Sequence, residues 1–375
     1  MDFIFSIGIF ACLFFFILLI NKKNKSIPDH ILAIWMLAIA LHLTSTYINI
    51  LGYWELYPHL IGITVPFPFF YGPMLYLYIQ YSIQDYSQFK FLDYLHFLPI
   101  ALSYGYMVPF FFTYTEEEKR LVDQGLVNDF GLFSQLMVFA FILSGLSYSI
   151  LSYRKLNKHE QLIADNFSNS ENLDLNWLKS FIWGIALLFI TVTLVLIAKE
   201  VIEVPFPFYP DLIFYAMLVG AILMLGYYGI RHQHIFTDHE VIDLKSMSNN
   251  AYQKSNLKEE LAGDKHEQLI TLMKEEKPYL APTLTLSDLA EQLDLSSHHL
   301  SQIINQFEQQ NFNDFVNKYR VEEFIQRAHK DSHFSFLALA LDSGFNSKST
   351  FNAVFRKQKG VTPSQYMSAQ MKKAS

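Results

Sequence analysis

Long runs of apolar residues dominate the chain up to Ile230. The first run, Phe3 to Ile20, has no charged residue, and its length is close to the ~20 residues that cross ~30 Å of hydrocarbon. Basic residues follow this run from Lys22 onward, whereas a signal peptide carries its basic residues first. The later runs are Ile31 to Leu51, Leu60 to Tyr81, Tyr94 to Tyr114, Phe130 to Tyr153, Trp177 to Ala198 and Leu212 to Ile230. This pattern predicts seven membrane-spanning helices.

The basic residues between these runs indicate an orientation, because cytoplasmic loops are enriched in Lys and Arg. If the N-terminus lies outside, the outer side holds Lys119, Arg120 and Lys199. The inner side then holds the larger set: Lys22, Lys23, Lys25, Lys90, Arg154, Lys155, Lys158, Lys179 and Arg231. We therefore predict a multi-pass protein of the inner (cytoplasmic) membrane, with its N-terminus outside and everything after Arg231 in the cytoplasm.

Polar side chains within or beside the spans are candidates for sensing a ligand, because such groups are costly in lipid and usually face a bundle interior. The candidates are His42, Asn49, Lys199 and Glu203. Structural roles are an open alternative for all of them. Lys199 and Glu203 stand four residues apart, so an ion pair explains them as well as a ligand clamp does.

Two similar stretches raise an alternative function for the membrane half. Residues 65–69 and residues 204–208 both read Val-Pro-Phe-Pro-Phe and begin the third and seventh runs. A parallel internal repeat, as found in some transporters, would place them so. Pro and Phe are also common where a helix enters a membrane interface. A small-solute transporter, in which the C-terminal part of the chain has a regulatory role, therefore stays open beside a sensor.

The composition and the motifs that the sequence lacks limit the kinds of site that this protein is expected to contain. Hydrophobic residues make up 51% of the chain and charged residues 17%, against roughly 25% charged in an average soluble protein. The single cysteine, Cys12, excludes an intrachain disulfide, and no nucleotide-binding or zinc-protease motif is present. A small cluster near the membrane, His232, His234, Asp238 and His239, suits a solvated linker better than a metal site. We expect no enzyme activity, no cofactor and no metal.

The pattern becomes polar after Arg231. Residues 231–277 read as a cytoplasmic linker that ends in an amphipathic helix, whose apolar positions include Leu269, Ile270, Leu272 and Met273. We expect this helix to pack on the domain that follows or on a second copy of the chain.

Residues 278–375 contain two pairs of short helices. In the first pair, Thr285 and Asp288 form a capping box, and Ser296 caps a second helix whose inward positions are Leu300, Ile303, Ile304 and Phe307. A longer helix follows from about Phe312 to His329. In the second pair, Ser335 caps residues 336–343, and Ser347 caps a helix that buries Phe351, Val354 and Phe355 and ends at Gly360. Each pair has the helix-turn-helix pattern.

This region resembles the AraC/XylS family of transcription regulators, whose DNA-binding region is two helix-turn-helices joined by a long helix. The resemblance covers about Tyr279 to Met367. It is carried by residues 286–290, 297–302 and 317–323 and by Gly344, Phe345, Phe351, Phe355, Gly360, Thr362, Pro363 and Tyr366. Gln302 stands where the family often has an arginine, which implies weaker or adenine-leaning contacts in the first recognition helix.

The outward faces of the two recognition helices provide the candidate DNA-binding residues. Asn and Gln can pair with adenine, and Arg or Lys with guanine, in the major groove. The set is His298, His299, Ser301, Gln302, Asn305, Lys348, Ser349, Asn352, Arg356, Lys357 and Lys359. The net charge of the chain is −7, but residues 332–375 hold six basic side chains and one acidic side chain, which favours phosphate contact there.

We therefore predict an all-α protein: a seven-helix transmembrane bundle at 1–230, a connector at 231–277, and a cytoplasmic double helix-turn-helix domain at 278–375. Its expected function is membrane-anchored, sequence-specific transcription regulation that couples a membrane or extracellular signal to gene expression. The expected partners are double-stranded operator DNA, the lipid bilayer, a second copy of the chain, and an unidentified small-molecule or membrane signal.

Overall fold

The computed structural model describes residues 2–83, 88–169, 176–200, 202, 206, 211–231, 259–330 and 333–374. The chain divides into two compact units. The first comprises 1–157 and 175–243, and the second comprises 158–174 and 244–375. All regular elements in the described ranges are helices, and a single isolated β-bridge joins Phe167 to Thr285. The predicted all-α class is confirmed.

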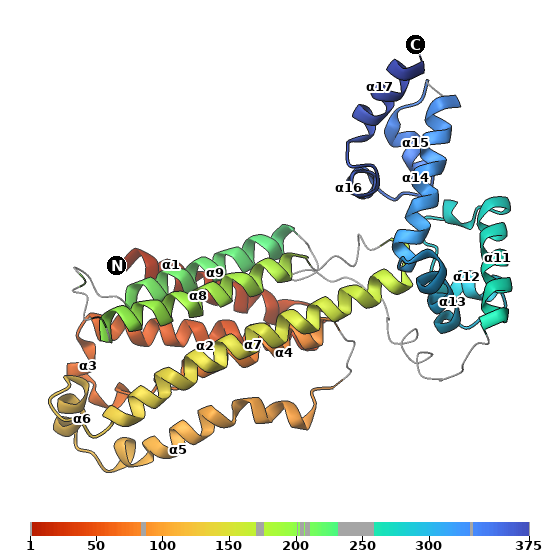
Figure 1. Cartoon of the computed structure of the whole chain (residues 1–375). Helices are drawn as coiled ribbons and strands as arrows, with labels where there is room; N and C mark the ends of the chain where they lie inside the picture. Colours follow the sequence, from red (N-terminus) through yellow and green to blue (C-terminus); the bar gives the residue numbers. More distant parts are fainter. Residues whose placement is uncertain are drawn as a thin grey trace. The chain divides into compact units, whose positions relative to one another are not determined.

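The longer helices of the first unit, within the described residues, lie side by side in Figure 1. They are α1 (Asp2–Asn21), α2 (Ile27–Ile50), α4 (Tyr71–Ile83), α5 (Leu98–Phe112), α7 (Gly131–Asn166), α8 (Asn176–Glu200) and α9 (Asp211–Arg231). Shorter elements connect them: α3 (Tyr53–Leu56), η1 (Pro58–Leu60), η2 (Phe67–Phe70), η3 (Phe91–Phe97) and α6 (Glu116–Asp123). Helix α1 packs against α2 and α9, and α8 packs against α9. The last turns of α7, from Lys158, belong to the second unit.

Six of the predicted spans coincide with helices in the described residues that are long and apolar enough to cross a membrane. The third run differs. Its α-helix, α4, has 13 residues, and Leu75, Leu77 and Ile79 in it have no exposed surface. Prolines at 66 and 68 explain the late start, because proline lacks the backbone N–H that continues a helix. The count of seven spans stays a prediction.

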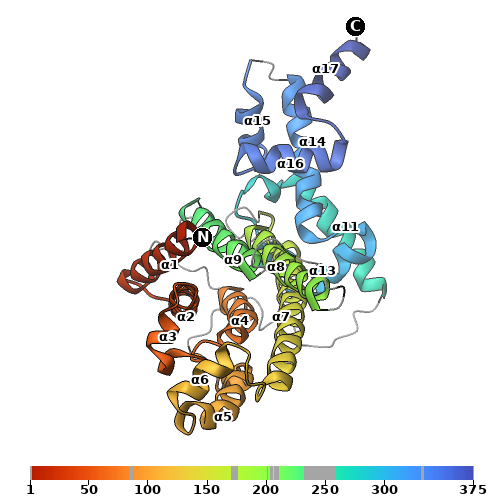
Figure 2. The ribbon, with the colours of Figure 1, turned by 90° about the vertical axis from the view of Figure 1, so that its left-hand side faces the viewer.

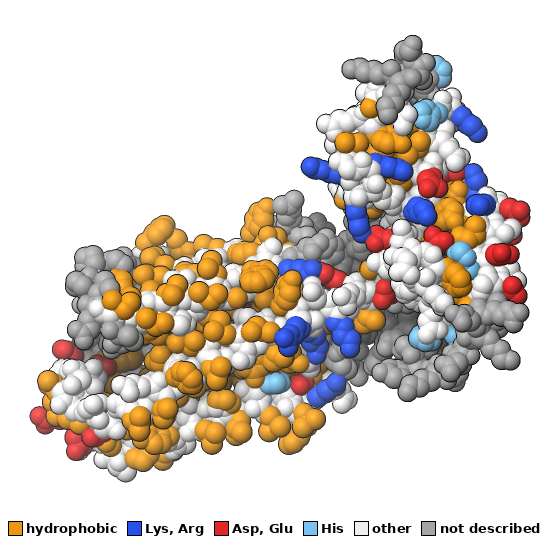
Figure 3. Space-filling model, in the orientation of Figure 1, with side chains coloured by type: hydrophobic (Ala, Val, Ile, Leu, Met, Phe, Trp, Pro, Cys, Tyr) orange, Lys and Arg blue, Asp and Glu red, His pale blue; other side chains and the backbone are white. Residues whose placement is uncertain are grey.

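The first unit carries apolar side chains on its outside as well as its inside. Trp35, Phe5 and Phe189 are buried in its core, whereas Phe10, Trp183 and Leu187 are largely exposed. Figure 3 shows hydrophobic side chains along the length of the bundle, acidic ones near α6, and basic ones at the opposite end. An apolar outer surface of this extent is what a lipid-facing bundle presents.

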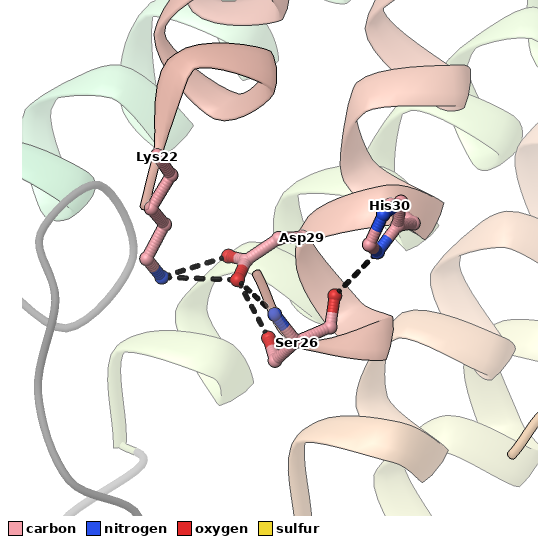
Figure 4. Close-up of polar contacts among 4 residues, drawn as sticks. All are labelled: Lys22, Ser26, Asp29 and His30. Atoms are coloured by element: carbon pink, nitrogen blue, oxygen red, sulfur yellow. Dashed lines mark hydrogen bonds and ion pairs between the residues drawn. The ribbon is translucent and has the colours of Figure 1, made fainter. Parts of the chain in front are cut away.

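The connection between α1 and α2 shows how one turn of this bundle is fixed (Figure 4). The backbone N–H and the hydroxyl of Ser26 each donate to Asp29 Oδ2 at 2.7 Å. Lys22 Nζ donates to both oxygens of Asp29 at 3.0 Å. Lys22, one of the predicted inner basic residues, is therefore neutralised by a buried carboxylate.

The second unit is built on one long helix, α14 (Phe312–Lys330). Figures 1 and 2 show α11, α12 and α13 packed at one end of it and α15, α16 and α17 at the other. The bounds are α11 (Glu259–Glu275), η5 (Pro278–Leu280), α12 (Leu286–Gln292), α13 (Ser297–Ile303), the π-helical turn η6 (Ile304–Glu308), α15 (Phe336–Asp342), α16 (Lys348–Lys359) and α17 (Pro363–Ala374).

Helix α14 contributes to two separate hydrophobic cores. Phe312, Phe315 and Val316 join the first core with residues of α11, α12 and α13. Further along, Val321 and Phe324 join the second core with residues of α15 and α16. The side chains of one helix thus hold the two motifs in a single unit.

Candidate nucleic-acid interface

The first helix-turn-helix forms as its local sequence predicts. The backbone N–H of Thr285 donates to Asp288 Oδ2 at 2.9 Å, and the N–H of Asp288 donates to Thr285 Oγ1 at 3.2 Å, so the predicted capping box opens α12. The turn passes through Asp294, whose φ of 53° is left-handed. Ser296 then accepts from the N–H of His299 and caps α13.

Helix α11 completes this first motif. Leu269 and Met273 are fully buried in its core, and Lys265 Nζ donates to the carbonyl of Leu293 at 2.8 Å. The amphipathic connector therefore packs on the helix-turn-helix domain that follows it, one of the two arrangements that the sequence allows.

The prediction that Phe307 is buried is wrong. Its side chain is 39% exposed and its ring stacks on His266, with 4.7 Å between the ring centroids. The cause is η6, because a π-helical turn holds more residues than an α-helical turn and rotates Phe307 off the inward face.

The second helix-turn-helix follows the same plan. Ser335 accepts from the N–H of Ala338, and Ser347 accepts from the N–H of Thr350, each at 3.2 Å. Gly360 adopts a left-handed φ of 76° and ends α16. Phe351 and Phe355 are buried against Phe324 of the linking helix. The recognition helix α16 is thus held at both ends and along its inner face.

The predicted contact residues of the first motif lie on the outer side of α13 and η6. Gln302 and Asn305 are exposed, while His298, His299 and Ser301 are half-buried. The rings of His298 and His299 have centroids 6.1 Å apart. This face offers hydrogen-bonding groups with little fixed charge.

The predicted contact residues of the second motif include the basic ones. Lys348, Ser349, Asn352 and Arg356 are exposed and lie on one side of α16. Figure 3 shows basic side chains on the visible surface of this unit. An amide and a guanidinium one helical turn apart can reach adjacent base edges in a major groove.

The basic residues near the end of α16 differ in their surroundings. Lys357 Nζ bonds to Asp314 Oδ1 of α14 at 2.6 Å, while Lys359 is half-buried. The predicted phosphate contact of Lys357 would therefore require exchange of this exposed ion pair, which costs little in water. The side chains of Lys372 and Lys373 lie outside the described residues.

Sequence reasoning missed Arg320, the residue at the centre of this unit. Its side chain is 1% exposed, and all five of its N–H groups are hydrogen-bonded. Nε donates to the carbonyl of Tyr279, and the two terminal nitrogens donate to Asn317, Ala281 and Ser168. No carboxylate pairs with it in the part of the chain that the structure describes. Burial lowers the pKa of Arg320 to about 10, so the guanidinium stays charged at neutral pH.

Gly344, in the turn of the second motif, packs directly on this arginine. Its φ of +93° is left-handed, and the site has no room for a side chain. A Cβ here would lie 2.2 Å from the carbonyl oxygen of Tyr279 and 3.0 Å from Arg320 Nε. Two features of the sequence could have drawn attention to Arg320: its place in the linking-helix motif and the glycine at position 344. No local sequence pattern predicts which residues accept its hydrogen bonds.

Of the predicted sensing residues of the membrane half, the structure describes the side chains of His42 and Asn49. His42 is buried, and its Nδ1 lies 2.5 Å from the hydroxyl of Tyr71. Asn49 is half-buried two turns further along α2. The side chain of Lys199, all of Glu203, the second Val-Pro-Phe-Pro-Phe stretch except Phe206, and the histidine cluster from His232 to His239 lie outside the described residues. The sensing role of these residues stays a prediction.

Comparison with known families identifies the class of the second unit. A family model described as a helix-turn-helix domain matches residues 289–369, which span α12 to α17. The comparisons with curated proteins and with solved structures found no match. The chain is a helix-turn-helix DNA-binding transcription regulator. More particularly, its residues 289–369 form a domain of the AraC type, and the described residues N-terminal to it include apolar helices long enough to cross a membrane.

Proposed function

We propose that this protein is anchored in a membrane by its first unit and regulates transcription by binding a specific operator with α13 and α16, in response to a signal at the membrane. The observation that carries the proposal is the joining, in one chain, of an apolar-surfaced helical bundle to two capped recognition helices with exposed polar faces. No catalytic step is part of it.

The charge distribution supports a cytoplasmic second unit. Acidic side chains near α6 and basic side chains at the other end of the bundle lie apart, as an outer and an inner face would require (Figure 3). Operator DNA, the bilayer and a second copy of the chain are the proposed partners.

The test is genome-wide DNA occupancy of the full-length protein in its native cell. The variant Asn352→Ala/Arg356→Ala removes two exposed groups four residues apart on α16. The matched control is Gln326→Ala/Lys330→Ala, which removes an amide and a cation at the same spacing from the exposed side of α14. We expect discrete peaks for the wild type and the control and their loss in the α16 variant. Peaks that survive in the α16 variant would contradict the assignment of α16 as a recognition helix.

A further inference from the structure

The second unit contains a segment that the sequence places between two apolar helices of the first. Residues 158–174 join α7 to α8, yet they belong to the compact unit that also holds the helix-turn-helices. Helix α7 continues without a break to Asn166, and the next residues, Phe167 and Ser168, contact the DNA-binding domain. We name residues 167–168 the clip.

The clip is held by backbone and side-chain hydrogen bonds. Phe167 forms the β-bridge with Thr285, the residue that caps α12. Both the backbone N–H and the hydroxyl of Ser168 donate to the carbonyl of Leu284, at 3.2 and 2.6 Å. From α14, Asn313 Nδ2 donates to the carbonyl of Phe167 at 3.0 Å. The clip thus reaches both the entrance of the first motif and the linking helix.

Arg320 makes the clip necessary to the fold of this unit. Two of its five hydrogen bonds go to Ser168: one terminal nitrogen donates to the Ser168 carbonyl at 3.1 Å, and the other donates to its hydroxyl at 3.0 Å. A guanidinium has five donors and no acceptor. Without the clip, two donors of a buried cation would lose their partners, and a buried donor without a partner is destabilising.

The position of Arg320 gives the clip control over both motifs. Through Tyr279 and Ala281 the guanidinium holds the chain that enters α12, and at Gly344 it supports the turn that leads to α16. A displaced clip would force Arg320 to find other acceptors, and both contacts would shift with it. DNA binding requires the two recognition helices to keep their positions relative to each other. It therefore depends on the hydrogen bonds of Arg320.

On this basis, and resting on the proposed function, we infer that the clip is the element through which the membrane half sets operator affinity. When the clip is seated on Arg320, the two motifs are ordered for DNA. When a change in the membrane half draws residues 158–169 away, the order is lost and affinity falls. The ligand of the membrane half need not touch the DNA-binding unit.

The test uses full-length protein in lipid nanodiscs and the operator found by occupancy mapping. Ser168→Val removes the hydroxyl that accepts from Arg320 and should weaken operator binding by about tenfold or more, as expected when a buried donor loses its partner. Gln161→Ala, at an exposed position on the last turns of α7, is the control and should bind as the wild type does.

An engineered disulfide distinguishes loss of affinity caused by a displaced clip from loss of affinity caused by general destabilisation of the fold. Phe167→Cys/Thr285→Cys places two cysteines opposite each other across the β-bridge, where Cβ atoms stand ~5 Å apart in antiparallel pairs. The native Cys12 is buried and will not interfere. In the Ser168→Val background, oxidation should restore the affinity and reduction should lower it again in the same sample.

Three results would decide the matter. Restoration on oxidation supports the clip as the controlling element. Unchanged affinity in Ser168→Val, or a loss that oxidation does not repair, overturns it and leaves residues 167–168 with a purely structural role. If the wild type shows no operator binding, the proposed function fails and not the clip.

Discussion

A single buried arginine joins four parts of the second unit. Arg320 bonds to the clip, to α14 itself through Asn317, and to the chain before α12, and it supports the turn at Gly344. All of its acceptors are neutral, so its burial is offset by the number of hydrogen bonds and not by an ion pair. This is unusual, because buried charges are usually paired.

Replacement of this arginine should therefore cost stability directly. Arg320→Met keeps the apolar stem but removes the hydrogen bonds that the guanidinium donates to the carbonyls of Tyr279, Ala281 and Ser168. It should lower the free energy of unfolding by about 2–4 kcal/mol. Arg356→Met, on the exposed face of α16, should change it by less than about 0.5 kcal/mol while it weakens operator binding. Differential scanning calorimetry of the two full-length variants checks this, and equal destabilisation would contradict it.

The hydrogen bonds of Glu323 predict how the stability of the second unit changes at low pH. It accepts from Lys277 at 2.9 Å, from Arg327 at 2.8 Å and from the Tyr279 hydroxyl at 3.1 Å. Burial alone would raise the pKa of Glu323, but the bonds from Lys277 and Arg327 outweigh it and hold the pKa below its usual 4.5.

The pKa is lower in the folded protein, so the stabilisation is fully present above about pH 4.5 and is lost as the pH falls through the folded value. As the pH falls from about 5 to about 3, the free energy of unfolding of Glu323→Gln should therefore decrease less than that of the wild type. The measurement is the unfolding midpoint across that range. Glu322→Gln, at the exposed neighbouring position, should keep the wild-type slope; a slope that is the same in all three proteins would refute the role of Glu323.

At the scale of elements, helix ends were predictable and long-range contacts were not. The caps at Thr285, Ser296, Ser335 and Ser347 use residues within three positions, so the sequence contains the whole interaction. Ser168, by contrast, meets Arg320 across 152 positions, and no local pattern encodes such a pairing. The π-helical turn that exposes Phe307 likewise depends on packing, whereas the late start of α4 follows from the local prolines at 66 and 68.

The cap of the second recognition helix offers a test at this scale. Ser347→Ala removes the oxygen that accepts from the N–H of Thr350 and should lower stability by about 1 kcal/mol. Ser349→Ala, two residues inside the same helix and exposed, should leave stability within about 0.5 kcal/mol of the wild type. Thermal unfolding followed by circular dichroism compares the two, and a larger loss in Ser349→Ala would show that the cap is not the stabilising feature.

For the whole molecule, the single cysteine permits a direct test of orientation. Cys12 has no exposed surface, so the wild type should not react with a membrane-impermeant maleimide and serves as the background. Glu117→Cys, exposed in α6, should be labelled in intact cells, because the proposed topology places it outside. Lys25→Cys, exposed between α1 and α2, should be labelled only after the cells are permeabilised. The reverse result would invert the topology.

The division of the chain into units has a consequence for how such a regulator could act. One way for a membrane-bound regulator to reach DNA is proteolysis, which releases the DNA-binding fragment so that it diffuses to the chromosome. Here a cut after α9 would leave Ser168 with the membrane helices and deprive the freed fragment of two partners for Arg320. An intact protein anchored as we propose would work at the bilayer, and its target gene would then have to come within reach of the membrane surface.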